Sequence, residues 1–347
     1  MPTNAHGSYL PSPASCQITA FTDRAPWWGG DLQTLRNQIM ERQSALPSRP
    51  YRLVFQTSDG SGDQLTGTLE RPLGPQSGPL IVLIHGLTGS EDSVYVRESA
   101  RFHLVRGRPV LRLNLRGAGD GRSLARGYYH AGCASDLQDI LDGLAGEEKQ
   151  KGFFLVGFSL GGNILLNLLG RVRPGHGVMG AATVSAPIEP SDARKRLMAP
   201  RNVLYHRFLL SRMKRDVLAA ADLSQLERSA VANAASIYDF DDRFVAPKNG
   251  FRDAPDYYER TAGARQVPAI TVPTLMLAAL NDPWIPAGAY FALRGSLPAC
   301  VSVVIARSGG HVGFHERGHS ETWYDRRIDD WIVHVQAARS LTSGFRC

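Results

Sequence analysis

The chain has 347 residues, of which 43% are hydrophobic and 20% charged, and this balance predicts a globular protein with a large buried core. It excludes a fibrous repeat and an intrinsically disordered chain. The formal net charge of +7 is mildly basic, but no run of lysine and arginine interleaved with aromatic residues accompanies it, so nucleic-acid binding is not predicted.

The four cysteines are Cys16, Cys133, Cys300 and Cys347, and they show none of the spacing of a zinc site. No apolar run is long enough to cross a bilayer, and the first 20 residues lack the basic start and apolar segment of a signal peptide. We therefore expect a soluble, cytoplasmic protein that requires neither a metal ion nor another cofactor.

An N-terminal arm, residues 1–50, precedes the first clear strand. Its first 20 residues are rich in serine, proline and small residues and predict a loosely held tail. Trp27 and Trp28 follow in the stretch PWWGGDLQTL. We interpret them as sealing a flank of the core, and the alternative is that they line a substrate entrance.

Strands and helices alternate through most of the remaining chain. Two strands at 51–56 and 65–71 flank the turn-rich SDGSGD and predict an antiparallel hairpin. The apolar runs that follow suit parallel strands covered by helices on both faces, so the sequence predicts a mostly parallel, doubly wound α/β sheet. The predicted strands are 80–84, 109–115, 153–156, 181–185, 274–279 and 301–306, and the predicted helices are 94–105, 134–144 and 322–338.

Residues 188–267 interrupt this alternation and divide the predicted core into residues 51–187 and 268–347. Helical patterns at 203–213 and 218–230 predict a helical cap insertion over the carboxyl ends of the strands, where open α/β sheets bind ligands. The cap is basic, which indicates either solvated helix faces or a surface that attracts anionic lipid or acidic substrate. Its basic residues include Arg194, Lys195, Arg196, Arg201, Arg207, Arg212, Lys214 and Arg215.

The strand at 153–156 leads into GFSLGG, which places Ser159 between glycines at a strand-to-helix turn. Glycines allow the chain to turn sharply and let the following helix pass close to neighbouring strands. Ser159 would then lie exposed at the carboxyl end of its strand, near the positive end of the helix that starts at Leu160. The short motif is weak by itself, so its partners decide the interpretation.

A nucleophilic serine needs a histidine to accept its proton and a carboxylate to orient that histidine. Asp282 directly follows the strand at 274–279, and His311 follows the strand at 301–306 by a short glycine-rich loop. The order serine, acid, histidine is the one expected for such an elbow. We therefore predict Ser159, Asp282 and His311 as a catalytic triad.

Other residues are weaker candidates for the base and the acid. His315 and His319 lie close to His311 in sequence, whereas His206 and His334 fall inside helical patterns. The acidic alternatives belong to the predicted cap and precede the strand that should deliver the acid. They are Asp239, Asp241 and Asp242.

The oxyanion hole is predicted from two backbone N–H groups, those of Leu160 after the nucleophile and Leu87 after the strand at 80–84. His85 is interpreted as a structural residue that holds this loop. The resulting prediction is a carboxylic ester hydrolase that forms an acyl-enzyme from a small-molecule substrate, an acyl or lipid ester. An acyltransferase or thioesterase with the same triad is the alternative, followed by a non-catalytic binding protein.

Several longer stretches together resemble the α/β-hydrolase superfamily, and within it the YheT-like group related to ABHD-type hydrolases. They are PWWGGDLQTL, HGLTGS with NLRGAGDG, YYHAGCASDL, GFSLGGN, FDDRFVAPKNGF with DYYERTA, and the late pair NDPWIP and SGGHVGF. The resemblance implies the α/β-hydrolase fold, the roles given above for Ser159, Asp282 and His311, and an esterase or lipid-directed activity. Asp31 departs from the group, which usually has histidine there.

Overall fold

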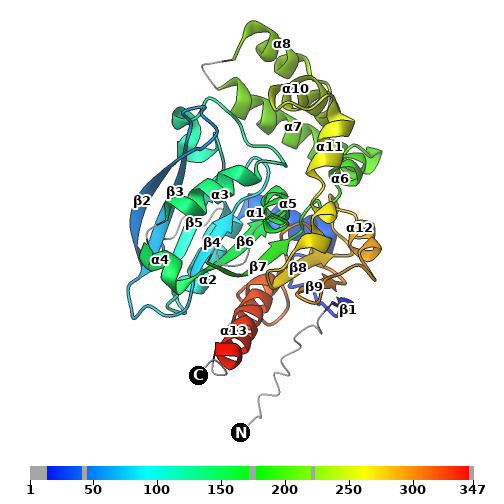
Figure 1. The fold of residues 1–347 in the computed structure, drawn as a ribbon. Coiled ribbons are helices and arrows are strands. Elements are labelled where there is room, and N and C mark those ends of the chain that lie inside the picture. Colours follow the sequence, from blue (N-terminus) through cyan, green and yellow to red (C-terminus); the bar gives the residue numbers. More distant parts are fainter. Residues whose placement is uncertain (1–13, 41–44, 145, 172–176, 220–222, 344–347) are drawn as a thin grey trace.

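The computed structural model describes residues 14–40, 45–144, 146–171, 177–219 and 223–343, and Figure 1 shows their arrangement. Residues 1–13 of the predicted tail and Cys347 lie outside the described residues. The centre of the molecule is a nine-stranded sheet in the order β1-β9-β8-β7-β6-β4-β5-β3-β2. Its strands are β1 (Cys16–Thr19), β2 (Ser48–Gln56), β3 (Gln64–Pro72), β4 (Leu80–Ile84), β5 (Val110–Asn114), β6 (Phe153–Phe158), β7 (Val178–Val184), β8 (Thr274–Ala279) and β9 (Val301–Ala306).

The predicted mostly parallel sheet with an antiparallel hairpin is confirmed. β2 pairs with β3 and β3 with β5 in antiparallel fashion, whereas the pairs from β5 through β4, β6, β7 and β8 to β9 are parallel. Chain order reverses beside β4, which has β5 on one side and β6 on the other. Such a reversal leaves a crevice at the carboxyl ends of the strands.

The predicted loose tail is wrong for β1. This strand pairs in parallel with β9, with Cys16 opposite Val303. The backbone groups at the free edge of β9 provide its partners, so a short strand with no buried residue of its own is held by hydrogen bonds. It therefore carries no hydrophobic pattern that would reveal it.

Helices cover both faces of the sheet, as the alternation of buried side chains requires. Leu80, Val82 and Ile84 of β4 pack in the core beneath α3 and α5, whereas Ile81 and Leu83 pack with α2 and α13. None of the described helices combines the length and apolar character needed to cross a membrane. The helices outside the cap are α1 (Gly29–Ile39), α2 (Val94–Leu104), η1 (Gly119–Leu124), α3 (Ala134–Gly143), α4 (Gly146–Lys151), α5 (Leu160–Leu169), α12 (Gly288–Ala292) and α13 (Trp323–Ser343).

Between β7 and β8 the chain forms a layer of helices beyond the carboxyl ends of the strands (Figure 1). These helices have a core of their own, which includes Leu209, Met213, Phe240 and Tyr258. The predicted helix at 218–230 is wrong in extent, because α7 ends at Leu218 and α8 starts seven residues later. The exact domain boundaries stay a prediction. The elements are α6 (Pro190–Leu197), η2 (Pro200–Asn202), α7 (Val203–Leu218), α8 (Gln225–Asn233), α9 (Ile237–Phe240), the π-helical turn η3 (Asp241–Val245), α10 (Ala246–Lys248), α11 (Ala254–Thr261), η4 (Gly263–Arg265) and η5 (Val267–Ala269).

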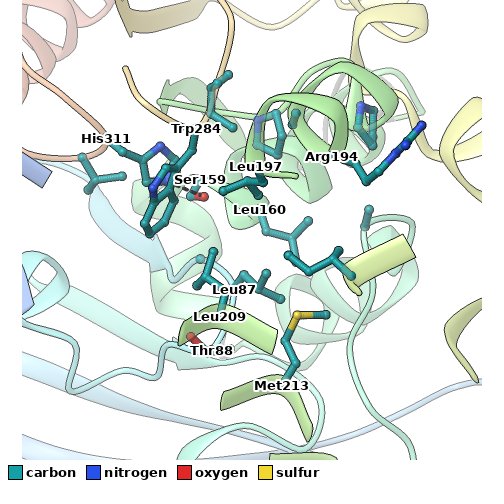
Figure 2. Close-up of a pocket in the computed structure, with 18 of the residues that line it drawn as sticks. Leu87, Thr88, Ser159, Leu160, Arg194, Leu197, Leu209, Met213, Trp284 and His311 are labelled. Atoms are coloured by element: carbon teal, nitrogen blue, oxygen red, sulfur yellow. Dashed lines mark hydrogen bonds between the residues drawn. The ribbon is translucent and has the colours of Figure 1, made fainter. Parts of the chain in front are cut away.

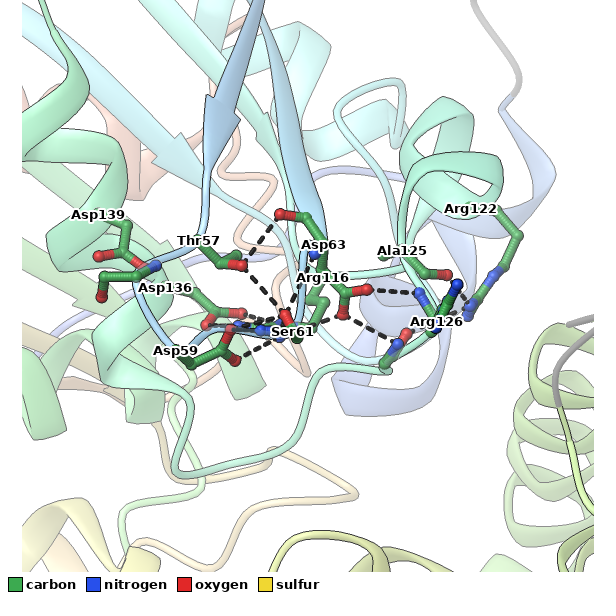
Figure 3. Close-up of polar contacts among 12 residues, drawn as sticks. Thr57, Asp59, Ser61, Asp63, Arg116, Arg122, Ala125, Arg126, Asp136 and Asp139 are labelled. Carbon is green, nitrogen blue, oxygen red and sulfur yellow. Dashed lines mark hydrogen bonds and ion pairs between the residues drawn. The ribbon is translucent and has the colours of Figure 1, made fainter.

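An ionic network ties the β2–β3 hairpin to the core (Figure 3). Arg116, which follows β5, pairs with Asp136 of α3 at 2.6 Å, with Asp63 at 3.1 Å and with Asp59 at 2.7 Å. Asp63 also accepts a hydrogen bond from the N–H of Arg126 at 2.7 Å. One arginine therefore joins the hairpin turn, the loop after β5 and α3.

Removing the buried acid of this network should destabilise the fold. We expect Asp136→Ala to lower the free energy of unfolding by about 3 kcal/mol, because it leaves the shielded Arg116 without its bidentate partner. Asp59→Ala is the matched control, since it removes a more exposed partner of the same arginine and should cost less than about 1 kcal/mol. Denaturant titration of both variants measures the free energy of unfolding. Equal losses in the two variants would contradict the prediction that Asp136 is the more important partner of Arg116.

Candidate active site

The turn between β6 and α5 places Ser159 in an unusual backbone conformation, with φ 49° and ψ −124°. A Cβ at Gly157 would lie 2.6 Å from the carbonyl oxygen of Gly161, and a Cβ at Gly161 would lie 2.4 Å from that of His85. Glycine is therefore a packing requirement on both sides of the serine. This turn presents the Ser159 side chain to the cavity beneath the cap.

The side chains of Ser159, His311 and Asp282 form one hydrogen-bonded chain. His311 Nε2 lies 2.9 Å from Ser159 Oγ, and His311 Nδ1 lies 2.9 Å from Asp282 Oδ2. A carboxylate only accepts, so Nδ1 donates to Asp282 and leaves Nε2 of the neutral ring to accept from the serine hydroxyl. The structure thus brings together the three residues predicted from sequence, whose catalytic role stays a prediction.

Asp282 is oriented by the backbone that follows it. Its second oxygen, Oδ1, accepts hydrogen bonds from the N–H groups of Trp284 at 2.8 Å and Ile285 at 2.9 Å. Asp282 and His311 are both buried, with 2% and 5% of their surface exposed. Competition from bulk water for their hydrogen bond is therefore small.

The loop after β4 passes directly beside the serine. A Cβ at Gly86 would lie only 2.8 Å from the Ser159 Cβ. Leu87, the next residue, and Leu160 line the same cavity as Ser159, and Figure 2 shows the three together. The two residues predicted to supply the oxyanion hole are therefore adjacent to the nucleophile candidate, and their function stays a prediction.

Tyrosine hydroxyls hold this loop on both sides of Leu87. The Gly86 N–H donates to the Tyr95 hydroxyl at 2.8 Å, and the Thr88 N–H donates to the Tyr129 hydroxyl at 2.6 Å. Because both flanking amides are fixed, the peptide of Leu87 has little freedom to rotate.

His85 is structural, in agreement with the interpretation of the sequence. Its Nε2 accepts from the Leu115 N–H at 3.1 Å, so Nδ1 carries the proton and donates to the Gly86 carbonyl at 2.7 Å. Complete burial lowers the pKa of His85 to about 4, which keeps the ring neutral.

The alternative bases and acids make their contacts elsewhere. The acids Asp239, Asp241 and Asp242 bond to the N–H of Ala235, the hydroxyl of Tyr258 and the N–H of Ala254, respectively. The histidine contacts are His315 with Arg36, His319 with Arg326, His206 with the N–H of Ile237, and His334 with the ring of Trp331.

Ser159 faces a cavity of about 160 Å³ between the sheet and the cap. Figure 2 shows Ser159 and His311 at one side of this cavity and Arg194 and Met213 at the other. The cavity is walled mainly by apolar side chains, a lining typical of sites for apolar ligands. The apolar residues include Leu87, Leu160, Leu197, Leu209, Met213, Trp284 and Ile285.

One part of this wall is polar. Asp241 of the π-helical turn is buried and accepts a hydrogen bond from the Tyr258 hydroxyl, 2.7 Å away. Burial raises the pKa of Asp241 to about 7, although the Tyr258 hydrogen bond and the charge of Arg194 oppose the shift. Near neutral pH this carboxyl is therefore divided between its charged and neutral forms.

A second cavity of about 620 Å³ adjoins the first and shares Leu87, Thr88 and Arg212 with it. Its lining is more polar. The charged side chains around it are Arg97, Arg122, Arg212 and Arg215 together with Asp92 and Asp216. The described ranges contain no grouping of three or more histidine, cysteine or acidic side chains suited to a metal ion.

Comparison with known proteins agrees with this geometry. The model of a family described as "Alpha/beta hydrolase family" matches residues 81–323, a span that includes Ser159, Asp282 and His311. The chain belongs to the alpha/beta hydrolase family. The predicted resemblance and fold class are therefore confirmed.

Two relatives are similar to this alpha/beta hydrolase over most of its length. The YheT protein of Escherichia coli, whose name describes it as a candidate esterase, is 29% identical over 89% of this chain and 92% of its own. Human "Phospholipase ABHD3" is 27% identical over 88% of this chain and 76% of its own. Among solved structures, the Pyrococcus furiosus esterase Pf2001 superposes with a TM-score of 0.57 at 14% identity, covering 92% of this chain and 99% of that one.

Two supporting residues of this alpha/beta hydrolase escaped the sequence analysis. The Trp284 ring packs on the imidazole of His311 with centroids 4.3 Å apart, and Thr34 Oγ1 accepts from the His311 N–H at 2.8 Å. Trp284 could have been suspected from its place two residues after Asp282. Thr34 gives no such signal, because it lies 277 residues from His311.

The buried carboxyl of Asp241 should make the stability of this alpha/beta hydrolase depend on pH. The pKa of Asp241 is higher in the folded chain, about 7 against an ordinary 3.8. Its contribution to the free energy of unfolding is therefore fully present below pH 4 and is lost as pH rises through 7. Asp241→Asn mimics the neutral form. We therefore expect the stability of the variant relative to wild type to rise between pH 4 and 7, as measured by denaturant titration; a constant difference would contradict this.

Proposed function

We propose that the protein is a serine hydrolase that cleaves carboxylic esters, with acyl or lipid esters as the substrate class. The observation that carries the proposal is the hydrogen-bonded chain of Ser159, His311 and Asp282 at the wall of an apolar cavity. The names of the relatives, which include a candidate esterase, phospholipases and a "Monoacylglycerol lipase" of Saccharomyces cerevisiae, support ester chemistry.

In this mechanism the Ser159 hydroxyl attacks the ester carbonyl while its proton passes to Nε2 of His311. Asp282 holds the imidazole in the required tautomer and stabilises its positive charge. Collapse of the tetrahedral intermediate breaks the bond to the alcohol, which leaves with the proton from His311. Water, deprotonated by the same histidine, then releases the acid from the acyl-enzyme.

The negative charge on the tetrahedral oxygen would be stabilised by the N–H groups of Leu87 and Leu160. Leu160 is the first residue of α5, so its N–H lies at the positive end of that helix. The fixed neighbours of Leu87, described above, keep its N–H in place before substrate binds. Such preorganisation is a large part of catalysis in acyl transfer.

The two cavities suggest how an ester would lie. We assign the acyl chain to the apolar cavity that contains Met213 and Leu209, and the alcohol part to the larger polar cavity beyond Thr88. An acyltransferase or thioesterase would use the same acyl-enzyme with another acceptor or leaving group. Product analysis with an added alcohol distinguishes transfer from hydrolysis.

We also infer a cytoplasmic location. Support comes from Cys16, Cys133 and Cys300, which are all free thiols. A reducing compartment keeps cysteines in this form.

Replacing the nucleophile should abolish activity without unfolding the protein. We expect Ser159→Ala to reduce hydrolysis of p-nitrophenyl butyrate by about 10³-fold or more and to prevent labelling by a fluorophosphonate probe. Ser229→Ala, which alters an exposed serine of α8, is the matched control and should label like wild type. Labelling of the Ser159→Ala protein at the wild-type rate would refute the assignment, and absence of labelling in wild type would favour a non-catalytic binding protein.

Narrowing the apolar cavity should shorten the preferred acyl chain. Met213 is buried in the cavity wall on the side away from Ser159, so Met213→Phe should lower kcat/KM for a decanoyl ester by roughly tenfold, in keeping with the 1–3 kcal/mol that a methylene is worth in a pocket. The acetyl ester serves as the control in the same protein and should change little. Equal losses for both esters would place the acyl chain elsewhere.

A further inference from the structure

Large apolar side chains lie exposed on the outer surface of α1 and α7. Leu204 is 77% exposed, Ile39 61%, Trp28 59%, Phe208 43% and Leu32 39%. We call these five residues the α1–α7 patch. Single exposed apolar residues are common, but a group of them on two adjoining elements marks an interaction surface.

Contacts between the two helices show that they run side by side in the same direction. Near the start of α1, Asp31 bonds to Arg201 at 2.6 Å and to the Tyr205 hydroxyl at 3.0 Å. Near its end, Gln38 bonds to Arg212 at 3.1 Å. The patch residues next to these contacts therefore form two neighbouring stripes.

Helix periodicity places both stripes on one side of the pair. Leu32 and Ile39 are seven residues apart, and Leu204 and Phe208 four apart, so each couple shares a helix face. The opposite, buried side faces the catalytic cavity, which is lined by Thr34 of α1 and Leu209 of α7 among others. The patch thus forms the outer surface of the α1–α7 layer that covers the cavity of Ser159.

The cavity reaches this surface between the two helices. Gln38, Phe208 and Arg212 line the cavity, and Gln38 and Phe208 are also exposed to solvent. The Arg212 guanidinium lies over the Phe208 ring, 5.1 Å from its centroid. These three side chains therefore lie where the cavity meets the patch, and we call this place the entrance.

The charge around the patch is positive. Residues 201–216 contain five basic side chains and one acid, Asp216, and α1 contributes Asp31, which pairs with Arg201. An apolar stripe bordered by arginine and lysine complements the surface of an anionic membrane. The basic residues are Arg201, Arg207, Arg212, Lys214 and Arg215.

We propose that the α1–α7 patch docks the protein on an anionic lipid surface, with its apolar side chains at the boundary between headgroups and acyl chains. Docking in this orientation turns the entrance between α1 and α7 toward the lipid. Of the two interpretations of the basic cap, the proposal selects the surface that attracts anionic lipid. It restricts this surface to α7 and the residues just before it. It does not depend on the chemistry proposed for Ser159.

Vesicle co-sedimentation of the full chain tests the apolar part. Wild type should bind vesicles of phosphatidylcholine with phosphatidylserine. The affinity of the double variant Leu204→Ser, Ile39→Ser for these vesicles should be lower by roughly tenfold or more. Leu226→Ser is the matched control, because Leu226 of α8 is 85% exposed but lies outside the patch. Failure of wild type to bind, or an equal loss in the control, overturns the proposal.

Charge reversal tests the electrostatic part. Arg207→Glu should weaken binding to anionic vesicles several-fold and make it less sensitive to salt, whereas Arg196→Glu, an exposed arginine on α6, should not. Equal effects of the two reversals would show that the cap attracts lipid only through its net charge and would overturn the assignment to the patch.

Two further measurements distinguish membrane docking from a failure of the proposed chemistry and from a dimer interface. Hydrolysis of soluble p-nitrophenyl butyrate should be unchanged in the Leu204→Ser, Ile39→Ser variant, so a loss of vesicle binding with activity retained is distinct from a failure of the proposed chemistry. Sedimentation velocity tests a second copy of the chain as occupant. A wild-type dimer that the same variant converts to monomer would make the patch a dimer interface and overturn membrane docking.

Discussion

The close approach of the β6–α5 turn to the end of β4 is the constraint on which the site depends. Ser159 occupies the left-handed region, a conformation that costs a non-glycine residue about 1–3 kcal/mol. Parallel pairing of β6 with β4 and β7 and the bond from the Ser159 N–H to the Val184 carbonyl hold it there. Gly86 passes the serine without a side chain, and the next residue, Leu87, lines the same cavity as Ser159.

The second constraint comes from the N-terminal arm. The loop that carries His311 is clamped by α1: Thr34 accepts from its N–H, and the Asn37 side chain donates to the Val312 carbonyl at 2.7 Å. A Cβ at Gly310 would lie 2.3 Å from the carbonyl oxygen of Gly30, so the loop and the helix touch backbone to backbone. The position of His311 therefore depends on residues that the sequence alone assigns to an arm outside the core.

The parts of the fold that were predictable are those with a strong local signal. Apolar runs such as that of β4 identify buried strands, and the glycines around Ser159 identify a turn that few other residues tolerate. The hydrogen-bonded group of Ser159, Asp282 and His311 followed from chain order at strand ends. β1 has no buried residue and pairs with β9 through its backbone, so no pattern of buried apolar residues reveals it. The interpretation of Trp28 as a residue that seals the core is wrong, because its side chain is exposed.

The other features that the sequence did not predict are contacts between segments that lie far apart in the chain. Asp31 stands where the resemblance implies histidine, and the structure shows that it pairs with Arg201. The inner contacts of α1, made by Thr34 and Asn37, are buried, whereas the contact to Arg201 is exposed and so contributes little to stability. Helix α1 is therefore held firmly against the His311 loop and only weakly against α7. Separating α1 from Arg201 would thus break a weaker contact than separating α1 from the loop that carries His311.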